Sequence, residues 1–75
     1  MAKFLFNEIL FMQVRLFTTF CARHPHVSPA QMDEYFTKYG IWNFIQEGYA
    51  GLHCEGDEVI YAEIMDIFTT RGVAL

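Results

Sequence analysis

Five residues have side chains suited to metal binding or thiol chemistry: His24, His26, His53, Cys21 and Cys54. A zinc site needs three or four converging ligands, usually in pairs separated by two or more residues. Here the pairs are a His-Pro-His run and two directly adjacent residues, His53 and Cys54. Adjacent side chains on a helix or strand point apart. The spacing therefore predicts no metal site, and no other motif predicts a cofactor.

Cys54 beside His53 is the pair closest to an activated nucleophile. Such a nucleophile needs a base at hydrogen-bond distance and a third group that orients the base. Adjacency in sequence does not place an imidazole on its neighbour's sulfur. We therefore expect that the protein is not an enzyme and that His53 bonds loop backbone or lies at an interface. A thiol or metal enzyme centred on this pair is the weaker alternative.

The charge distribution argues against a nucleic-acid surface. The chain has five lysines and arginines against nine acidic residues, a net charge of −4. The basic residues are scattered, whereas phosphate binding needs them clustered. Residues 1–39 sum to +1 (four basic, three acidic) and residues 40–75 to −5 (one basic, six acidic). The acidic half is suited to a basic partner surface.

Length and apolar content predict a single small domain that associates with another chain. The 75 residues predict one domain, residues 1–75, whose core supplies only about 3–5 kcal/mol net. A hydrophobic fraction of 53% is high for so small an interior and favours association. Two cysteines are too few for a disulfide framework, so we expect a cytoplasmic protein. Glu8, Gln13 and Arg15 interrupt the apolar N-terminal run, which argues against a membrane span.

End signals define the first two predicted helices. A helix over about residues 3–22 is long and apolar, and Pro25 stops it. Ser28 is the N-cap of the second helix, with Pro29 at its first position. Gly40 ends that helix as a left-handed residue.

The third predicted helix covers about residues 41–50, weakened towards its end by Gly48 and Gly51. The fourth begins at Asp57 as N-cap and ends at Gly72. Residues 59–62, Val-Ile-Tyr-Ala, are β-prone, and a short strand there stays open. The fold class predicted is all-α, a small bundle of about four helices.

The first helix carries more apolar side chains than one core face needs. At about 100° per residue, its broad stripe is expected to face the core. Phe4, Phe11 and Met12 lie outside that stripe, so we expect them to form an interface with another chain. The stripe comprises Phe6, Ile9, Leu10, Val14, Phe17, Phe20 and Cys21. Residues expected to be largely buried are Phe6, Leu10, Phe17, Phe36, Trp42, Ile45, Ile64 and Phe68.

The second and third helices, joined at Gly40, have the order of a helix-turn-helix. The would-be recognition helix, IWNFIQEGYA, has no basic residue, and only Asn43 and Gln46 could read bases. A small dimeric DNA-binding regulator is therefore kept as the alternative function.

Three short motifs carry a resemblance: Tyr39-Gly40, then Tyr49-Ala50-Gly51-Leu52-His53, then the Ile-rich acidic segment from Val59 to Gly72. In these, over residues 4–73, the chain resembles a family of short uncharacterised bacterial proteins often encoded beside ADP-ribosyltransferase-like toxins. The resemblance implies an antitoxin-like or accessory subunit. Leu52 and His53 match the family's most distinctive pair, which marks them as a functional or structural loop. Cys54 departs from the small polar residue that commonly follows.

The function predicted is a small non-catalytic protein–protein interaction module. Its partner is expected to be a second copy, giving a homodimer, or a cognate toxin-like protein, with no nucleic acid and no membrane. Phe4, Phe11 and Met12 of the first helix are expected to supply the surface.

Overall fold

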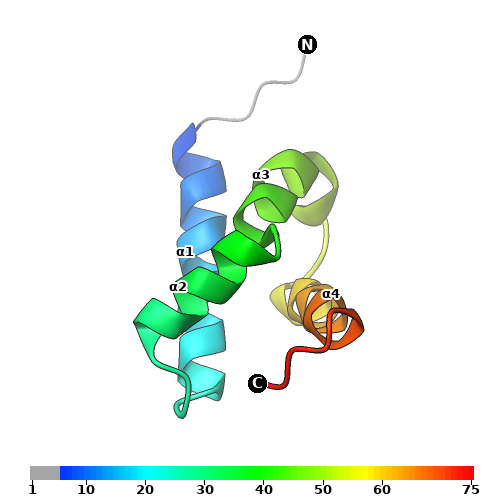
Figure 1. Cartoon of the computed structure of the whole chain (residues 1–75). Helices are drawn as coiled ribbons and strands as arrows, with labels where there is room; N and C mark the ends of the chain where they lie inside the picture. The colour runs from blue at the N-terminus through cyan, green and yellow to red at the C-terminus, as the bar shows by residue number, and fades with distance from the viewer. Residues whose placement is uncertain (1–5) are drawn as a thin grey trace.

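The computed structural model describes residues 6–75, which form an all-α bundle (Figure 1). Its helices are α1 (Phe6–Arg23), α2 (Pro29–Lys38), α3 (Ile41–Leu52) and α4 (Asp57–Thr70). Over the described range there is no strand, and residues 59–62 lie in the first turns of α4. The predicted fold class is confirmed. Residues 3–5, the start of the first predicted helix, lie outside the described range.

The core lies where the four helices meet. In Figure 1, α1 stands on one side and α4 on the other; α2 runs diagonally across α1, and α3 continues from it to the upper right, beside α1. All four helices contribute fully buried side chains, so each depends on the others to shield its apolar face. The buried residues are Met12, Leu16, Phe20, Met32, Phe36, Ile41, Ile45, Leu52, Ile60, Ile64 and Phe68.

Phe20 of α1 is the centre of an aromatic cluster that joins three helices. Its ring centroid lies 5.5 Å from that of Phe36 in α2 and 5.8 Å from that of Phe68 in α4, both edge-on. Tyr61 of α4 stacks on it at 4.4 Å. Edge-to-face and offset-stacked pairs of this kind add to the free energy gained from burial alone.

The signals that begin and end α2 act as the sequence predicts. The Ser28 Oγ accepts a hydrogen bond from the Gln31 N–H at 3.1 Å, which satisfies one of the free amides of the first turn. Gly40 follows the helix with φ = +70°, a conformation that side chains with a Cβ rarely adopt. Because Gly40 is also the N-cap of α3, its turn joins the two helices directly.

The end of α4 is a Schellman motif, as predicted. Gly72 has φ = +78°. The Val73 N–H donates to the Phe68 carbonyl at 2.9 Å, and the Gly72 N–H donates to the Thr69 carbonyl at 3.0 Å. These bonds satisfy carbonyls that would otherwise be free at the helix end.

Two predicted helix ends are wrong. The N-cap of α4 is Gly56, not Asp57, and no side chain caps this helix. The Asp57 carboxylate instead accepts hydrogen bonds from Arg15 of α1. The third helix does not fade at residue 50 but continues through Gly51 to Leu52, because Leu52 is buried in the core and holds the last turn in place.

The predicted core face of α1 is right only in part: Phe20 is buried, and Phe17 and Cys21 pack partly buried against the core, as expected. The side chains that face the core are Met12, Leu16 and Phe20, whereas Phe6 and Leu10 are exposed. Apolar side chains lie on more than one side of this helix, and the contacts with α2, α3 and α4 select the side that is buried, which the local pattern identifies only in part.

Burial agrees with prediction better in the rest of the core. Phe36, Ile45, Ile64 and Phe68 are fully buried, as expected. Phe17 and Trp42 are only partly buried, at the margin of the core where their rings stack on each other.

Candidate interaction surface

Four large apolar side chains of α1 lie on the surface of the bundle. We call them the outer stripe: Phe6, Leu10, Phe11 and Val14. Phe6, Leu10 and Val14 follow one another at steps of four residues, so they form a ridge along one side of the helix. Their exposed fractions are 75%, 41% and 52%, and that of Phe11 is 66%. The described chain has one further exposed large hydrophobic residue, Val59 on α4.

Three residues of the outer stripe, Phe6, Leu10 and Phe11, belong to the part of α1 that precedes its first buried residue, and Val14 follows it by two positions. None of residues 6–11 is buried, and burial begins at Met12. In Figure 1 this blue start of α1 stands at the edge of the bundle, with α3 and α4 both on one side of it. At the level of this start, no described helix lies on its opposite side in this view.

The two charged residues that border Phe11 have opposite signs. Glu8 precedes it by three residues and Arg15 follows it by four, so both share its side of the helix. Arg15 pairs with Asp57 of α4, its Nε donating at 2.7 Å and its Nη2 at 3.2 Å. This ion pair holds the start of α4 against α1.

The three residues expected to form the interface differ in where the structure places them. Phe11 is exposed, as predicted. Met12 is 4% exposed and belongs to the core, so the expectation that it lies off the core face is wrong. Phe4 lies outside the described residues. Sequence reasoning missed Phe6, Leu10 and Val14, because it assigned them to the core.

Leu52 and His53, the pair marked by the family resemblance, are separated by the helix end. Leu52 is buried, whereas His53 is the exposed C-cap of α3 and stacks on Tyr49 with ring centroids 5.2 Å apart. The Cys54 Sγ lies 3.7 Å from the His53 Nε2. Both side chains are exposed.

The other histidines occupy the connector after α1. The His24 Nε2 lies 2.6 Å from the Tyr61 hydroxyl of α4, and its ring stacks on Phe20. Burial, with the charges of the neighbouring His26 and Arg23, lowers the pKa of His24. His24 therefore serves as a packed, hydrogen-bonded contact between α1 and α4.

Metal ligands do not converge in the described part of the chain. Residues 6–75 contain no group of three histidines, cysteines or carboxylates placed to hold an ion. Cys21 is partly buried, and burial raises the pKa of its thiol. That shift favours the protonated thiol, which is a poor nucleophile and a poor metal ligand.

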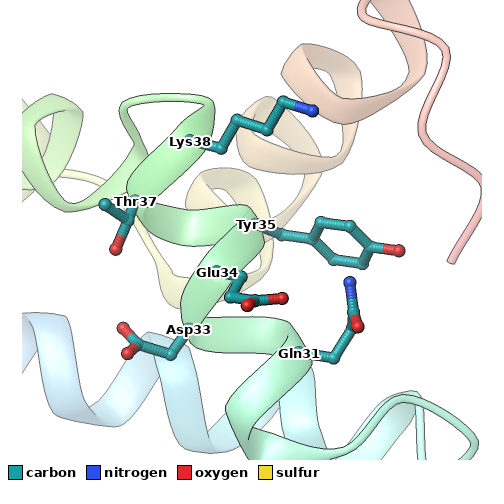
Figure 2. A pocket seen from close by; sticks show the side chains of 6 residues that line it. All are labelled: Gln31, Asp33, Glu34, Tyr35, Thr37 and Lys38. Atoms are coloured by element: carbon teal, nitrogen blue, oxygen red, sulfur yellow. The ribbon is translucent and has the colours of Figure 1, made fainter.

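The outer side of α2 has a hollow of about 430 Å³, shown in Figure 2. Every residue that lines it comes from this one helix, and its side chains fan out in several directions instead of converging on a point. Ligand sites generally enclose their ligand with groups from several elements. The hollow is therefore ordinary helix surface. Its residues are Gln31, Asp33, Glu34, Tyr35, Thr37 and Lys38.

Among the described helices, none has the length and apolar character needed to cross a membrane.

Comparison with known proteins gives one match. Neither the curated proteins nor the solved structures include a match to this chain. A protein-family model described as "Protein of unknown function (DUF3791)" matches residues 16–71. The matched segment begins inside α1 and reaches the end of α4, so it contains most of the core, while the outer stripe precedes it. The chain therefore belongs to the DUF3791 family.

Proposed function

We propose that this protein is a small non-catalytic interaction module that binds another protein through the outer stripe of α1. The observation that carries the proposal is the exposure of Phe6 and Phe11 at 75% and 66%. Large exposed apolar side chains gathered on one face commonly mark a protein interface. Aromatic side chains are also the most frequent anchors of such interfaces.

The core does not need the outer stripe, which supports a binding role. The buried cluster is closed by residues from all four helices, and no described buried side-chain N or O atom lacks a hydrogen-bond partner. Exposed apolar surface costs solubility. The fold does not need these exposed side chains, and their exposure lowers solubility. A partner that covers them best explains their presence.

The finer proposal is an accessory or antitoxin-like subunit. It rests on the resemblance to proteins encoded beside toxin-like enzymes, and on the acidic C-terminal half, which suits a basic partner surface. The outer stripe lies before the family match. Binding through it would therefore be a property of this chain in addition to whatever the matched segment contributes.

DNA binding through α2 and α3 has less support. The exposed side chains of α3 include Asn43, Gln46 and Glu47, and α3 contains no lysine or arginine. The Trp42 indole N–H, at the start of the helix, donates to Asp33 at 3.0 Å. A recognition helix without a cation has no electrostatic attraction to phosphate.

The experiment compares association by the wild-type chain, by a Phe6→Gln/Phe11→Gln variant and by Val59→Gln as matched control. Val59 is 52% exposed on α4, so the control also removes exposed apolar surface but leaves α1 intact. Circular dichroism first checks that each variant folds. Self-association is measured by sedimentation, and binding to other proteins by quantitative affinity capture from the native host with each partner identified.

We expect the wild type and the Val59 variant to associate alike and the double variant to lose binding. Association that is equal in all three proteins, or absent from all three, would refute the proposal.

A further inference from the structure

We propose that α4 is a pH-controlled arm: protonation of His24 favours its release from α1, while α1, α2 and α3 stay packed on one another. His24 is the first residue after α1, and its side chain contacts Tyr61 of α4. The outer stripe lies towards the other end of α1. The inference therefore goes beyond the proposed function and does not depend on it.

The packing of the helices makes α4 the one most easily released. The helices α1, α2 and α3 each pack closely on both of the other two, whereas α4 packs closely only on α1. Parts of a protein with few close neighbours open locally before the whole fold does. Because α4 buries Ile60, Ile64 and Phe68 in the core, the closed form still dominates at neutral pH.

The polar contacts between α1 and α4 differ in burial. The ion pairs that Arg15 and Arg23 form with the first turn of α4 lie at the surface, where such pairs stabilise little. The contact between the His24 Nε2 and the Tyr61 hydroxyl, 2.6 Å long, is partly buried. Aromatic rings surround it, since the His24 ring stacks on Phe20 at 5.8 Å and on Tyr61 at 6.2 Å. The protonation state of His24 therefore matters at this joint.

The charged groups that face His24 do not favour a second cation. On α1, the Arg23 guanidinium carbon lies 4.5 Å from the centre of the Tyr61 ring. In the connector, the His26 ring lies 6.2 Å from that of His24. On α4, the facing groups are the Tyr61 hydroxyl and the Glu58 carboxylate, and both oxygens of that carboxylate accept hydrogen bonds from Arg23.

No side chain of α2 or α3 within residues 6–75 bonds to His24 or stacks on it, except through the rings it shares with the core. A protonated His24 would therefore lie beside one fixed cation and a second histidine. The carboxylate that faces it already balances Arg23.

Proton linkage gives the direction of the switch. Burial, followed by the charges of His26 and Arg23, lowers the pKa of His24 in the closed form. Release of α4 removes Tyr61 from the ring and returns the pKa towards its ordinary value of about 6.5. The open form then binds the proton more tightly. The closed form is therefore favoured fully above about pH 6.5, and opening increases as the pH falls below that value.

The size of the effect has an upper limit. At about pH 5.5, one unit below the ordinary histidine pKa, protonation of His24 in the open form raises the opening equilibrium constant by at most roughly tenfold. Carboxylates, with ordinary pKa values near 4, stay ionised at that pH and contribute little. The range from about pH 7.5 to 5.5 therefore isolates the histidines.

The test is native-state hydrogen exchange of the full chain, followed by NMR at about pH 7.5 and 5.5 and corrected for the intrinsic exchange rates. We expect the amides of α4 to open more often than the buried amides of α2 and α3 at both pH values. The opening constant of α4 should rise roughly fivefold to tenfold at the lower pH. A titration of the His24 ring in the same samples should have its midpoint below pH 6.5.

Two variants assign the effect. His24→Gln keeps a polar side chain opposite Tyr61 but cannot titrate, so the opening constant of α4 should change less than twofold with pH. His53→Gln is the matched control, because it removes a histidine from the exposed end of α3, away from the joint. It should retain the full rise.

Other results would overturn the inference. Equal opening constants for α4 and for the buried amides of α2 and α3 would show that α4 does not leave alone. A rise that persists in His24→Gln, or disappears in His53→Gln, would assign the switch to another group. An opening constant independent of pH in the wild type, or a His24 midpoint at or above pH 6.5, would refute control by this histidine.

Discussion

The same substitution, glycine to alanine, should have opposite effects at Gly40 and Gly51. Gly40 joins α2 to α3 with φ = +70°, and a Cβ built there meets nothing within 4 Å. The cost of an alanine is therefore conformational alone, about 1–2 kcal/mol for a left-handed residue with a side chain. Gly51 lies inside α3, where an added Cβ also meets nothing within 4 Å. At this position an alanine lowers the conformational entropy of the unfolded chain and has a higher helix propensity than glycine, so it should stabilise the folded protein.

The gain at Gly51 is smaller than the loss at Gly40. An alanine in place of a helical glycine stabilises by about 0.4–1 kcal/mol, and Gly51 is next to the last residue of α3, where the helix depends less on each position. We therefore expect about 0.5 kcal/mol, at the lower end of that range. For a domain of this size 1 kcal/mol corresponds to about 4–8 °C in the melting temperature. Gly40→Ala should melt roughly 5–15 °C below the wild type and Gly51→Ala roughly 2–4 °C above it.

Gly48→Ala provides an internal comparison. Gly48 is also helical, but its added Cβ would lie 3.3 Å from the Leu52 Cδ1, and Leu52 is buried. The strain on this core side chain offsets the gain in helix propensity, so the melting temperature should rise less than for Gly51→Ala. The three variants differ from the wild type by one methyl group each, so they compare backbone conformation at Gly40 and side-chain contact at Gly48 with Gly51.

The assay is thermal unfolding followed by circular dichroism, with all proteins at one concentration because dimerisation would raise the melting temperature. A Gly40→Ala protein as stable as the wild type would show that the turn does not need a left-handed residue. A Gly51→Ala protein less stable than the wild type would show that α3 does not continue through residue 51.

Two further predictions concern the cap of α2 and the histidine between α1 and α4. Ser28→Ala should cost about 1 kcal/mol, since it removes the acceptor of the Gln31 N–H; Ser28→Asp should retain most of the stability, and equal melting of wild type and Ser28→Ala would contradict the cap. His24 has a lowered pKa in the folded state, chiefly through burial, so the unfolded chain binds the proton more readily. The contribution of His24 to the free energy of unfolding should therefore be complete above about pH 6.5, the ordinary pKa of histidine, and should decline as the pH falls below it. Chemical denaturation at several pH values should show a smaller decline for His24→Gln, and identical pH profiles would refute the role of His24. The carboxylate of Glu58, whose pKa is lowered by Arg23, adds its own loss only nearer its ordinary pKa of about 4.

Local signals allowed much of the fold to be predicted. Ser28, Gly40 and Gly72 act within one turn of their own position, and each begins or ends a helix as expected. The core face of α4 was found because most of its large apolar residues share one side, whereas in α3 the expected core residue Ile45 was found and Ile41 and Leu52 were missed. Ile45 and Ile64 are buried as predicted.

The errors arise where the outcome depends on distant residues. Asp57 is a good N-cap by its type, but its carboxylate pairs with Arg15, 42 positions away. For α1, two apolar faces were available, and only the packing of the other helices buries Met12 and leaves Phe6 outside. The surplus of apolar surface could thus be predicted from composition, whereas its position could not.

Trp42 is the single tryptophan of the chain, and its surroundings make it a selective optical reporter. Its ring lies 5.3 Å from Phe17 of α1 and 4.9 Å from Phe36 of α2, and its indole N–H bonds to Asp33 of α2. Its fluorescence therefore registers the joining of α1, α2 and α3, whereas ellipticity counts every helix. Coincident transitions by the two signals would mean that α4 melts together with the other three helices. Ellipticity lost before the emission changes would mean that α4 detaches first and leaves a three-helix intermediate.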